Sequence, residues 1–286
     1  MQLFVPRTIG YISSVLAMDR LLELGKDECA MLGGFVEARI TDALGTDSPS
    51  GVGPLLVRAI RARLLHENTE RLSSGSDFDR RFGVSTSGKI PLSALNIDSD
   101  NKAAGTRYEP TAPPAFSEMI AALPQKMIPR ATFIDIGCGR GRVMLMAAEH
   151  GFRRIIGIDF AADLCLTARG NVEQYRRCSN NSAAIRIEQR DACTYDIPNQ
   201  PGVLFLYNPF SESVMRSFVA NVERSLSQHP REFYVIYYMP LWNKVWEVSP
   251  ILSKLAGTHM WSAEWYSIYS CKLILQSRGQ RKFRRL

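Results

Sequence analysis

Short hydrophobic runs alternate with amphipathic stretches along most of the chain beyond residue 130. The runs are rich in Val, Ile, Phe and Tyr and are followed by Gly, Pro, Asn or Asp, which is typical of strands buried on both faces. Because helix-like stretches separate the runs, the pattern predicts an α/β fold with a mostly parallel sheet covered on both faces. The predicted strands are residues 131–136, 154–159, 184–189, 202–206, 233–238 and 265–276.

Helices are predicted between these strands and after the fifth. Pro240 favours a helix that begins just after it. The stretch around residues 259–261 is expected to be the hairpin partner of the last strand, which brings the sheet to six or seven strands. The predicted helices are residues 115–123, 143–149, a segment that begins near 161, 212–226 and 241–255.

The same patterns divide the chain into three parts. Residues 1–76 are mostly helix-like and end in a Ser/Gly-rich break, so they are predicted to form a helical N-terminal extension. Residues 77–276 carry the α/β pattern and are long enough to bury one large core. Residues 277–286 form a basic C-terminal tail. The extension is expected either to cover a substrate cleft or to serve in packing or dimerisation.

A glycine-rich turn follows the strand predicted at 131–136. Asp135 lies two residues before Gly137, and Gly139 and Gly141 follow at alternate positions. Glycines in a strand-to-helix turn can adopt positive φ and let a ligand approach the backbone, while the next helix offers unpaired N–H groups. The turn therefore predicts a nucleoside-binding site. The alternative is a tight turn whose glycines serve packing alone.

The glycine spacing discriminates between ligands. A dinucleotide-binding turn has the form G-x-G-x-x-G, but here Arg142 occupies the place of its third glycine. The form acid-x-G-x-G-x-G resembles instead the first motif of the class I, seven-strand S-adenosylmethionine-dependent methyltransferases. The resemblance implies a doubly wound, Rossmann-like sheet of seven strands with an antiparallel last strand, and S-adenosyl-L-methionine as the cofactor. It assigns cofactor binding at this turn to Asp135, Gly137, Cys138, Gly139 and Gly141.

Two further acids fall where this fold would use them. Asp159 ends the second predicted strand, at a spacing in which a β-α-β unit brings an acid to a ribose, and Phe160 beside it is taken as part of the same site. The alternative role of Asp159 is to cap the helix that begins near residue 161. Asp191 follows the third strand, and the resemblance implies that Asp191 and the adjacent Ala192 bind the adenine.

The fourth strand runs directly into Tyr207, Asn208, Pro209 and Phe210. Proline donates no N–H and restricts the residue before it, so the backbone leaves the sheet there, with Asn208 at its carboxyl end. The turn is similar to the Asn-Pro-Pro-Tyr or Phe motif of family members that methylate planar amino nitrogens, although it has only one proline. The resemblance implies that Asn208, Pro209 and Phe210 contact the acceptor. The alternative is a strand-ending turn in which Ser211 caps the next helix.

The segment before the glycine turn carries two more candidates. In many of these enzymes this part of the chain lids the cofactor, which suggests Tyr108 and Thr111 as cofactor contacts. Residues 78–86 look like a segment found in some bacterial methyltransferases of unassigned substrate, a group also distantly similar to the seven-strand histone lysine methyltransferases. The resemblance covers roughly residues 77 to 275.

The charge and the cysteine and histidine content limit the classes of function that are possible. The net charge of +7 and the basic tail permit nucleic-acid binding, but 28 acidic residues offset the bases and no nucleic-acid-binding module is visible. The six cysteines show no C-x-x-C pairing and the four histidines no metal spacing, so neither a zinc site nor a disulfide framework is indicated. We expect a cytoplasmic protein with no membrane span and no metal.

The sequence therefore predicts an S-adenosylmethionine-dependent methyltransferase. A nitrogen acceptor is favoured over oxygen, because an oxygen nucleophile would want a general base and the sequence identifies none. A protein or small-molecule acceptor is favoured over nucleic acid, and the oligomeric state is open. The alternatives are a nucleic-acid methyltransferase, an NAD-dependent oxidoreductase and a non-catalytic cofactor-binding protein.

Overall fold

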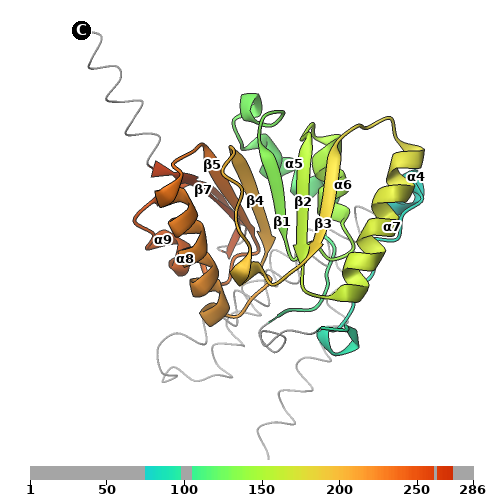
Figure 1. Cartoon of the computed structure of the whole chain (residues 1–286), viewed down its shortest axis with the longest axis horizontal. Coiled ribbons are helices and arrows are strands. Elements are labelled where there is room, and N and C mark those ends of the chain that lie inside the picture. Colours follow the sequence, from blue (N-terminus) through green and yellow to red (C-terminus); the bar gives the residue numbers. More distant parts are fainter. Residues whose placement is uncertain (1–74, 98–104, 261–262, 273–286) are drawn as a thin grey trace, which may run out of the picture. The chain divides into compact units, whose positions relative to one another are not determined.

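In the computed structural model, residues 75–97, 105–260 and 263–272 are described, and they contain a seven-stranded sheet of order β3-β2-β1-β4-β5-β7-β6 (Figure 1). The predicted doubly wound α/β fold is thereby confirmed. Residues 1–74 of the predicted extension and the whole basic tail lie outside the described residues, so the boundary at residue 76 stays a prediction. The strands are β1 (Thr132–Ile136), β2 (Arg154–Asp159), β3 (Ala184–Gln189), β4 (Gly202–Tyr207), β5 (Phe233–Tyr238), β6 (Leu252–Met260) and β7 (Ala263–Cys271).

Strand β1 lies in the middle of the sheet, where the strand order reverses. It pairs in parallel with β2 on one side and with β4 on the other, so that Phe133 faces Ile155 and Val203 in register. Chains that leave β1 and β4 therefore diverge at the carboxyl edge of the sheet, where open α/β folds bind ligands. The expected antiparallel last strand is confirmed, because β7 runs antiparallel to β5.

Helices cover both faces of the sheet (Figure 1). Alternate residues of each strand point to opposite faces. Leu204 and Leu206 pack in one buried cluster with Phe218 of α8 and Trp246 of α9. On the other face, the ring of Phe133 lies 5.9 Å from that of Phe116 in α5. The helices are α4 (Gly75–Phe82), α5 (Pro113–Ala121), α6 (Arg142–Glu149), α7 (Ala162–Cys178), α8 (Glu212–Gln228) and α9 (Asn243–Glu247).

Helix α5 begins earlier than predicted, at Pro113 instead of residue 115. Two prolines occupy its first positions, where the missing N–H groups would have had no intrahelical partner. Among the described residues, no helix combines the length and the apolar character needed to cross a membrane.

The helix predicted at 241–255 is wrong in extent. Helix α9 has five residues, and β6 begins at Leu252. Pro250 ends the helix because it donates no N–H and restricts Ser249. The Ser249 hydroxyl then accepts hydrogen bonds from the N–H groups of Ile251 and Leu252, at 3.3 and 3.1 Å, which turns the chain into the strand. The hairpin partner of β7 is accordingly longer than the predicted 259–261.

Gly157 in β2 gives a test of the packing between sheet and helix. A Cβ at this position would lie 2.2 Å from Met144 Sδ and 2.8 Å from Cys138 Sγ. We expect Gly157→Ala to lower the free energy of unfolding by about 1–3 kcal/mol, as overpacked cores do. Urea denaturation measures this.

Gly170→Ala is the matched control, because Gly170 is exposed on α7 and a Cβ there would meet no atom within 4 Å. It should raise the free energy of unfolding by about 0.5–1 kcal/mol through helix propensity. Equal effects of the two substitutions would contradict the packing described for Gly157.

Candidate active site

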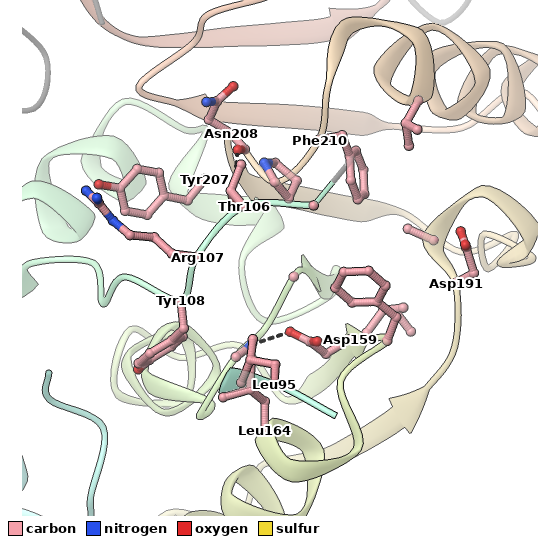
Figure 2. Close-up of a pocket in the computed structure, with 18 of the residues that line it drawn as sticks. Leu95, Thr106, Arg107, Tyr108, Asp159, Leu164, Asp191, Tyr207, Asn208 and Phe210 are labelled. Atoms are coloured by element: carbon pink, nitrogen blue, oxygen red, sulfur yellow. Dashed lines mark hydrogen bonds between the residues drawn. The ribbon is translucent and has the colours of Figure 1, made fainter. Parts of the chain in front are cut away.

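A cavity of about 340 Å³ lies at the carboxyl edge of the sheet, within the size range of small-molecule sites (Figure 2). The cavity is lined by the turn after β1, the ends of β2 and β3, the turn after β4 and the loop of residues 105–109. Most of the residues predicted from the sequence line it. The lining residues are Leu95, 105–109, Gly137, Gly139, 158–160, Leu164, 190–192, 207–210 and Val214.

The glycine turn folds over the end of β2. The N–H groups of Gly137 and Cys138 both donate to the carbonyl oxygen of Ile158, at 2.8 and 3.0 Å. Gly139 has a φ of 55° and lies against the ring of Tyr108, so a Cβ at this position would be 2.3 Å from two ring carbons. Only glycine fits both the left-handed backbone and this close approach.

Asp159 is buried in the wall of the cavity, at 6% exposure. One carboxylate oxygen accepts the N–H of Gly139 at 2.8 Å, and the other accepts the N–H of Ala161 at 2.9 Å. Asp159 therefore ties the glycine turn to the residue before α7. The N-cap position of α7 is Ala161 and carries no side-chain capping hydrogen bond, so the alternative role of Asp159 as the helix cap is wrong. Each oxygen keeps a second lone pair. Burial raises the pKa of Asp159, and the backbone N–H groups of Ala161, Gly139 and Phe160 offset part of that rise.

Asp135 lies behind the turn and is 2% exposed. Its Oδ2 atom has no hydrogen-bond partner among the described residues. Burial raises the pKa of Asp135 well above its usual value, and the charge of Asp159 raises it further. The two acids therefore form a buried pair beneath the glycine turn.

Asp191 and Asn208 lie on different sides of the cavity. In the view of Figure 2, Asp159 lies between Tyr108 and Asp191, and Asn208 lies across the cavity from Leu164. Asp191 accepts the N–H of Cys193 at 2.9 Å and thereby begins a short 3₁₀ turn, so its carboxylate is held at the rim.

The turn after β4 is braced by neighbouring groups. Asn208 has a φ of 39°, an uncommon conformation for a residue other than glycine. Its Oδ1 accepts the hydroxyl of Tyr237 at 2.8 Å. The indole N–H of Trp242 donates to the carbonyl of Phe210 at 3.1 Å, and Gly105 forms a β-bridge with Phe210. Ser211 occupies the N-cap position of α8, as the alternative expected, but its side chain makes no capping hydrogen bond.

Four predicted residues do not line the cavity. Cys138 and Thr111 are buried, and Gly141 is the N-cap residue of α6. Asp135 is the fourth, and direct contact with a ligand stays a prediction for all four.

Several lining residues were missed by the sequence reasoning. Arg107 and Glu109 flank Tyr108, so the loop that carries it was recognised but its charges were not. Glu109 lies between two cations, 2.7 Å from the Lys89 ammonium and 2.7 Å from the Arg107 guanidinium. Leu95 and Leu164 carry no local signal, because they meet only through folding.

The buried acid pair predicts a pH dependence of stability. The pKa of Asp135 is raised on folding. Its neutral form therefore contributes fully to the free energy of unfolding below the unfolded pKa of about 3.9, and this contribution is lost as pH rises through the folded pKa. We expect the unfolding free energy of the wild type to fall relative to that of Asp135→Asn as the pH rises above about 4. Urea titrations at increasing pH measure it, and parallel curves would contradict the burial of an ionisable pair.

One family model matches the part of the chain that contains the glycine turn. Residues 133–229 match a family model described as a methyltransferase domain. No curated protein matches the chain. These matched residues run from β1 to the end of α8 and include the glycine turn, Asp135 and Asp159.

Three similar solved structures share 12–19% identity with the chain. A structure described as StiE O-MT has 17% identity and a TM-score of 0.39, with 52% of this chain and 54% of that chain covered. An RNA methyltransferase from Salinibacter ruber, in complex with S-adenosyl-L-homocysteine, has 19% identity and a TM-score of 0.39, with 57% and 92% covered. Magnesium protoporphyrin IX methyltransferase from Synechocystis PCC 6803, with bound SAM, has 12% identity and a TM-score of 0.41, with 73% and 96% covered.

The matched segment lies in a sheet of order 3-2-1-4-5-7-6 whose β7 is antiparallel to β5. Its acid-x-G-x-G-x-G turn opens on a cavity at the carboxyl edge. Residues 133–229 of the chain therefore correspond to a methyltransferase domain with this sheet order and this turn.

Proposed function

We propose that the protein transfers a methyl group from S-adenosylmethionine to a nitrogen atom of a protein or small-molecule acceptor. One observation carries the proposal. A single cavity is lined by the glycine turn, Asp159, Asp191 and the Asn208 turn, which are the groups that a cofactor and an acceptor would need together.

The residues present fit the cofactor. Asp159 keeps a lone pair on each oxygen for the two ribose hydroxyls, and charge-assisted hydrogen bonds of this kind are among the stronger ones. Gly137 and Gly139 give the backbone approach that the methionine end would use, with Tyr108 as the adjoining wall. Asp191 and Ala192 are the proposed adenine contacts at the rim.

S-adenosylmethionine supplies the activated methyl group on a sulfonium that leaves as a neutral thioether. The chain itself has to align the acceptor atom with that methyl carbon and to exclude water. The braced Asn208 turn suits the first task, because a rigid backbone positions a reacting atom better than a mobile one.

The preference for a nitrogen acceptor is supported by the hydrogen bonds and ion pairs that the lining carboxylates already make. An acceptor hydroxyl would want a general base, whereas a neutral amine already carries its nucleophilic lone pair. Asp159 and Asp191 accept backbone N–H groups, and Glu109 is held by Lys89 and Arg107. Each lining carboxylate therefore already serves another group.

Asn208 is the proposed contact to the acceptor, with Pro209 and Phe210. Its Oδ1 is shared with the Tyr237 hydroxyl, so one lone pair of that oxygen and the two amide N–H donors are available to an acceptor. Such a side chain suits an acceptor that carries both a donor and an acceptor of hydrogen bonds near the methylated atom. The ring of Phe210 would contact its planar group.

A polynucleotide acceptor is less well supported. Two arginines line the cavity, Arg107 and Arg190, against three acids, Glu109, Asp159 and Asp191. Binding to a phosphate backbone depends on an excess of positive charge, which this lining does not offer.

Cofactor binding is tested by isothermal titration of the full chain. We expect S-adenosylmethionine to bind and Asp159→Asn to weaken the binding about 100-fold, because two charge-assisted hydrogen bonds are lost. Asp196→Asn, at an exposed acid outside the cavity lining, should leave the affinity unchanged. Binding of NAD in place of S-adenosylmethionine, or equal affinities of the two variants, would refute the proposed cofactor site.

Methyl transfer is tested with tritiated S-adenosylmethionine and a cell lysate separated into protein, nucleic-acid and small-molecule fractions. We expect label in the protein or the small-molecule fraction. Tyr237→Phe should lower the labelling rate about tenfold through misplacement of Asn208, with unchanged cofactor affinity.

Tyr269→Phe is the matched control for this substitution, because the Tyr269 hydroxyl donates to Asn243 Oδ1 at 3.0 Å in the buried core and does not line the cavity. It should leave the labelling rate unchanged. Label in the nucleic-acid fraction alone, or no transfer at all despite cofactor binding, would show that the acceptor assignment is wrong.

A further inference from the structure

Arg142 follows the third glycine of the turn and is almost completely buried, at 2% exposure. Its partners come from the upstream segment of residues 79–87. The Nε atom donates to the Thr86 hydroxyl at 2.7 Å, and Nη2 donates to the Ser87 hydroxyl at 2.6 Å and lies 3.5 Å from Asp79 Oδ1. Arg142, which occupies the place of the third glycine of a dinucleotide-binding turn, therefore connects the glycine turn to this segment.

Asp79 organises the segment from its other side. One carboxylate oxygen accepts the backbone N–H groups of Thr86 and Ser87, both at 2.8 Å, and the other accepts the Thr86 hydroxyl. Thr86 is fully buried. Burial acts to raise the pKa of Asp79, but the hydrogen bonds from Thr86 and Ser87 outweigh it and hold the pKa below its usual value.

The segment reaches the cavity through Tyr108. The Tyr108 hydroxyl donates to the backbone carbonyl of Thr86 at 2.6 Å, which fixes the outer end of the ring. The ring itself lies against Gly139 and lines the cavity (Figure 2). Arg140, inside the glycine turn, donates to the carbonyl of Ser87 at 2.9 Å and lies 5.6 Å from the centre of the Tyr108 ring.

Asn171 of α7 closes the arrangement. Its amide exchanges two hydrogen bonds with the backbone of Ser85, at 2.8 and 3.1 Å, and donates to the carbonyl of Arg140 at 2.9 Å. The 79–87 segment is therefore joined to the glycine turn by side chains of both the turn and the next helix.

We propose that Asp79 and Arg142 are positioning residues of the cofactor site: they hold the 79–87 segment on the glycine turn so that Tyr108 forms a fixed wall against Gly139. This rests on the proposed function for the identity of the ligand. Neither residue lines the cavity. Their effect on the ligand passes through Thr86 to Tyr108. This gives residues 78–86, whose resemblance was noted from the sequence, a role in cofactor binding.

Arg142→Lys tests the proposal, because lysine keeps the charge and loses the fork that engages Thr86 and Ser87. Arg231→Lys is the matched control: Arg231 is also buried, donates to the Ser225 hydroxyl at 2.8 Å, and does not line the cavity. We expect Arg142→Lys to weaken S-adenosylmethionine and S-adenosylhomocysteine binding about tenfold by calorimetry, and Arg231→Lys to leave both unchanged.

Tyr108→Phe is the mild second variant, because it keeps the ring and removes only the hydrogen bond to Thr86. It should weaken binding several-fold on its own and add little in an Asp79→Asn background, because both substitutions break one connection. An Arg142→Lys protein that loses melting temperature but binds the cofactor within about twofold of the wild type would overturn the proposal, and so would additive effects of Tyr108→Phe and Asp79→Asn.

Hydrogen exchange of the 105–111 peptide, without cofactor, separates this proposal from the proposed function. Exchange should be faster in Arg142→Lys than in the wild type and unchanged in Arg231→Lys. If the wild type binds neither cofactor form, the proposed function fails, and unchanged exchange in Arg142→Lys overturns the positioning role independently of it.

Discussion

The hydrogen bond from the Gly139 N–H to the Asp159 carboxylate is the contact on which the rest of the site depends. It joins the turn after β1 to the end of β2, and the second oxygen of Asp159 carries the connection to the start of α7. This geometry requires positive φ at Gly139 and places a second acid, Asp135, in the buried region behind the turn. Ionising both acids in such a place is costly, which raises the pKa of Asp135, and functional sites are where proteins tolerate such perturbed groups.

The two sides of the cavity are held by different parts of the chain. The side that carries the glycine turn depends on residues before the sheet, because Tyr108 is fixed through Thr86 and through the arginines of the turn. The side that carries the Asn208 turn depends on β5 and the residues after it, because Tyr237 and Trp242 brace that turn. Under the proposed assignment, acceptor specificity can therefore change without disturbing the cofactor pocket, which is consistent with one fold serving many acceptors.

The sheet could be predicted from the sequence because its determinants are local. Strands β2, β3 and β5 have the predicted bounds, and β1 and β4 differ by one residue at one end. Their hydrophobic runs are bounded by turn residues, and the acids that follow them reach the cavity as expected. The same local reasoning failed at 241–255, where apolar periodicity suggested a helix and Pro250 with the Ser249 hydroxyl ends it early.

The bracing of the site could not be predicted, since it joins residues far apart in the chain. Arg142 and Thr86 meet only because α6 and the upstream segment pack together, and no pattern near either residue indicates the other. The sequence carried one signal, an arginine where a glycine would be expected beside a turn. Likewise, Asn208 was recognised from its turn, but its partner Tyr237 lies inside a strand whose apolar character concealed the hydroxyl.

A crystal structure of the protein with S-adenosylhomocysteine would be the sharpest test of the cofactor site, because it locates each part of the ligand. We expect the ribose hydroxyls on Asp159, the adenine beside Asp191 and Ala192, and the sulfur between Gly137 and the Asn208 turn. A ligand bound elsewhere, or bound in this cavity with its ribose away from Asp159, would contradict this assignment.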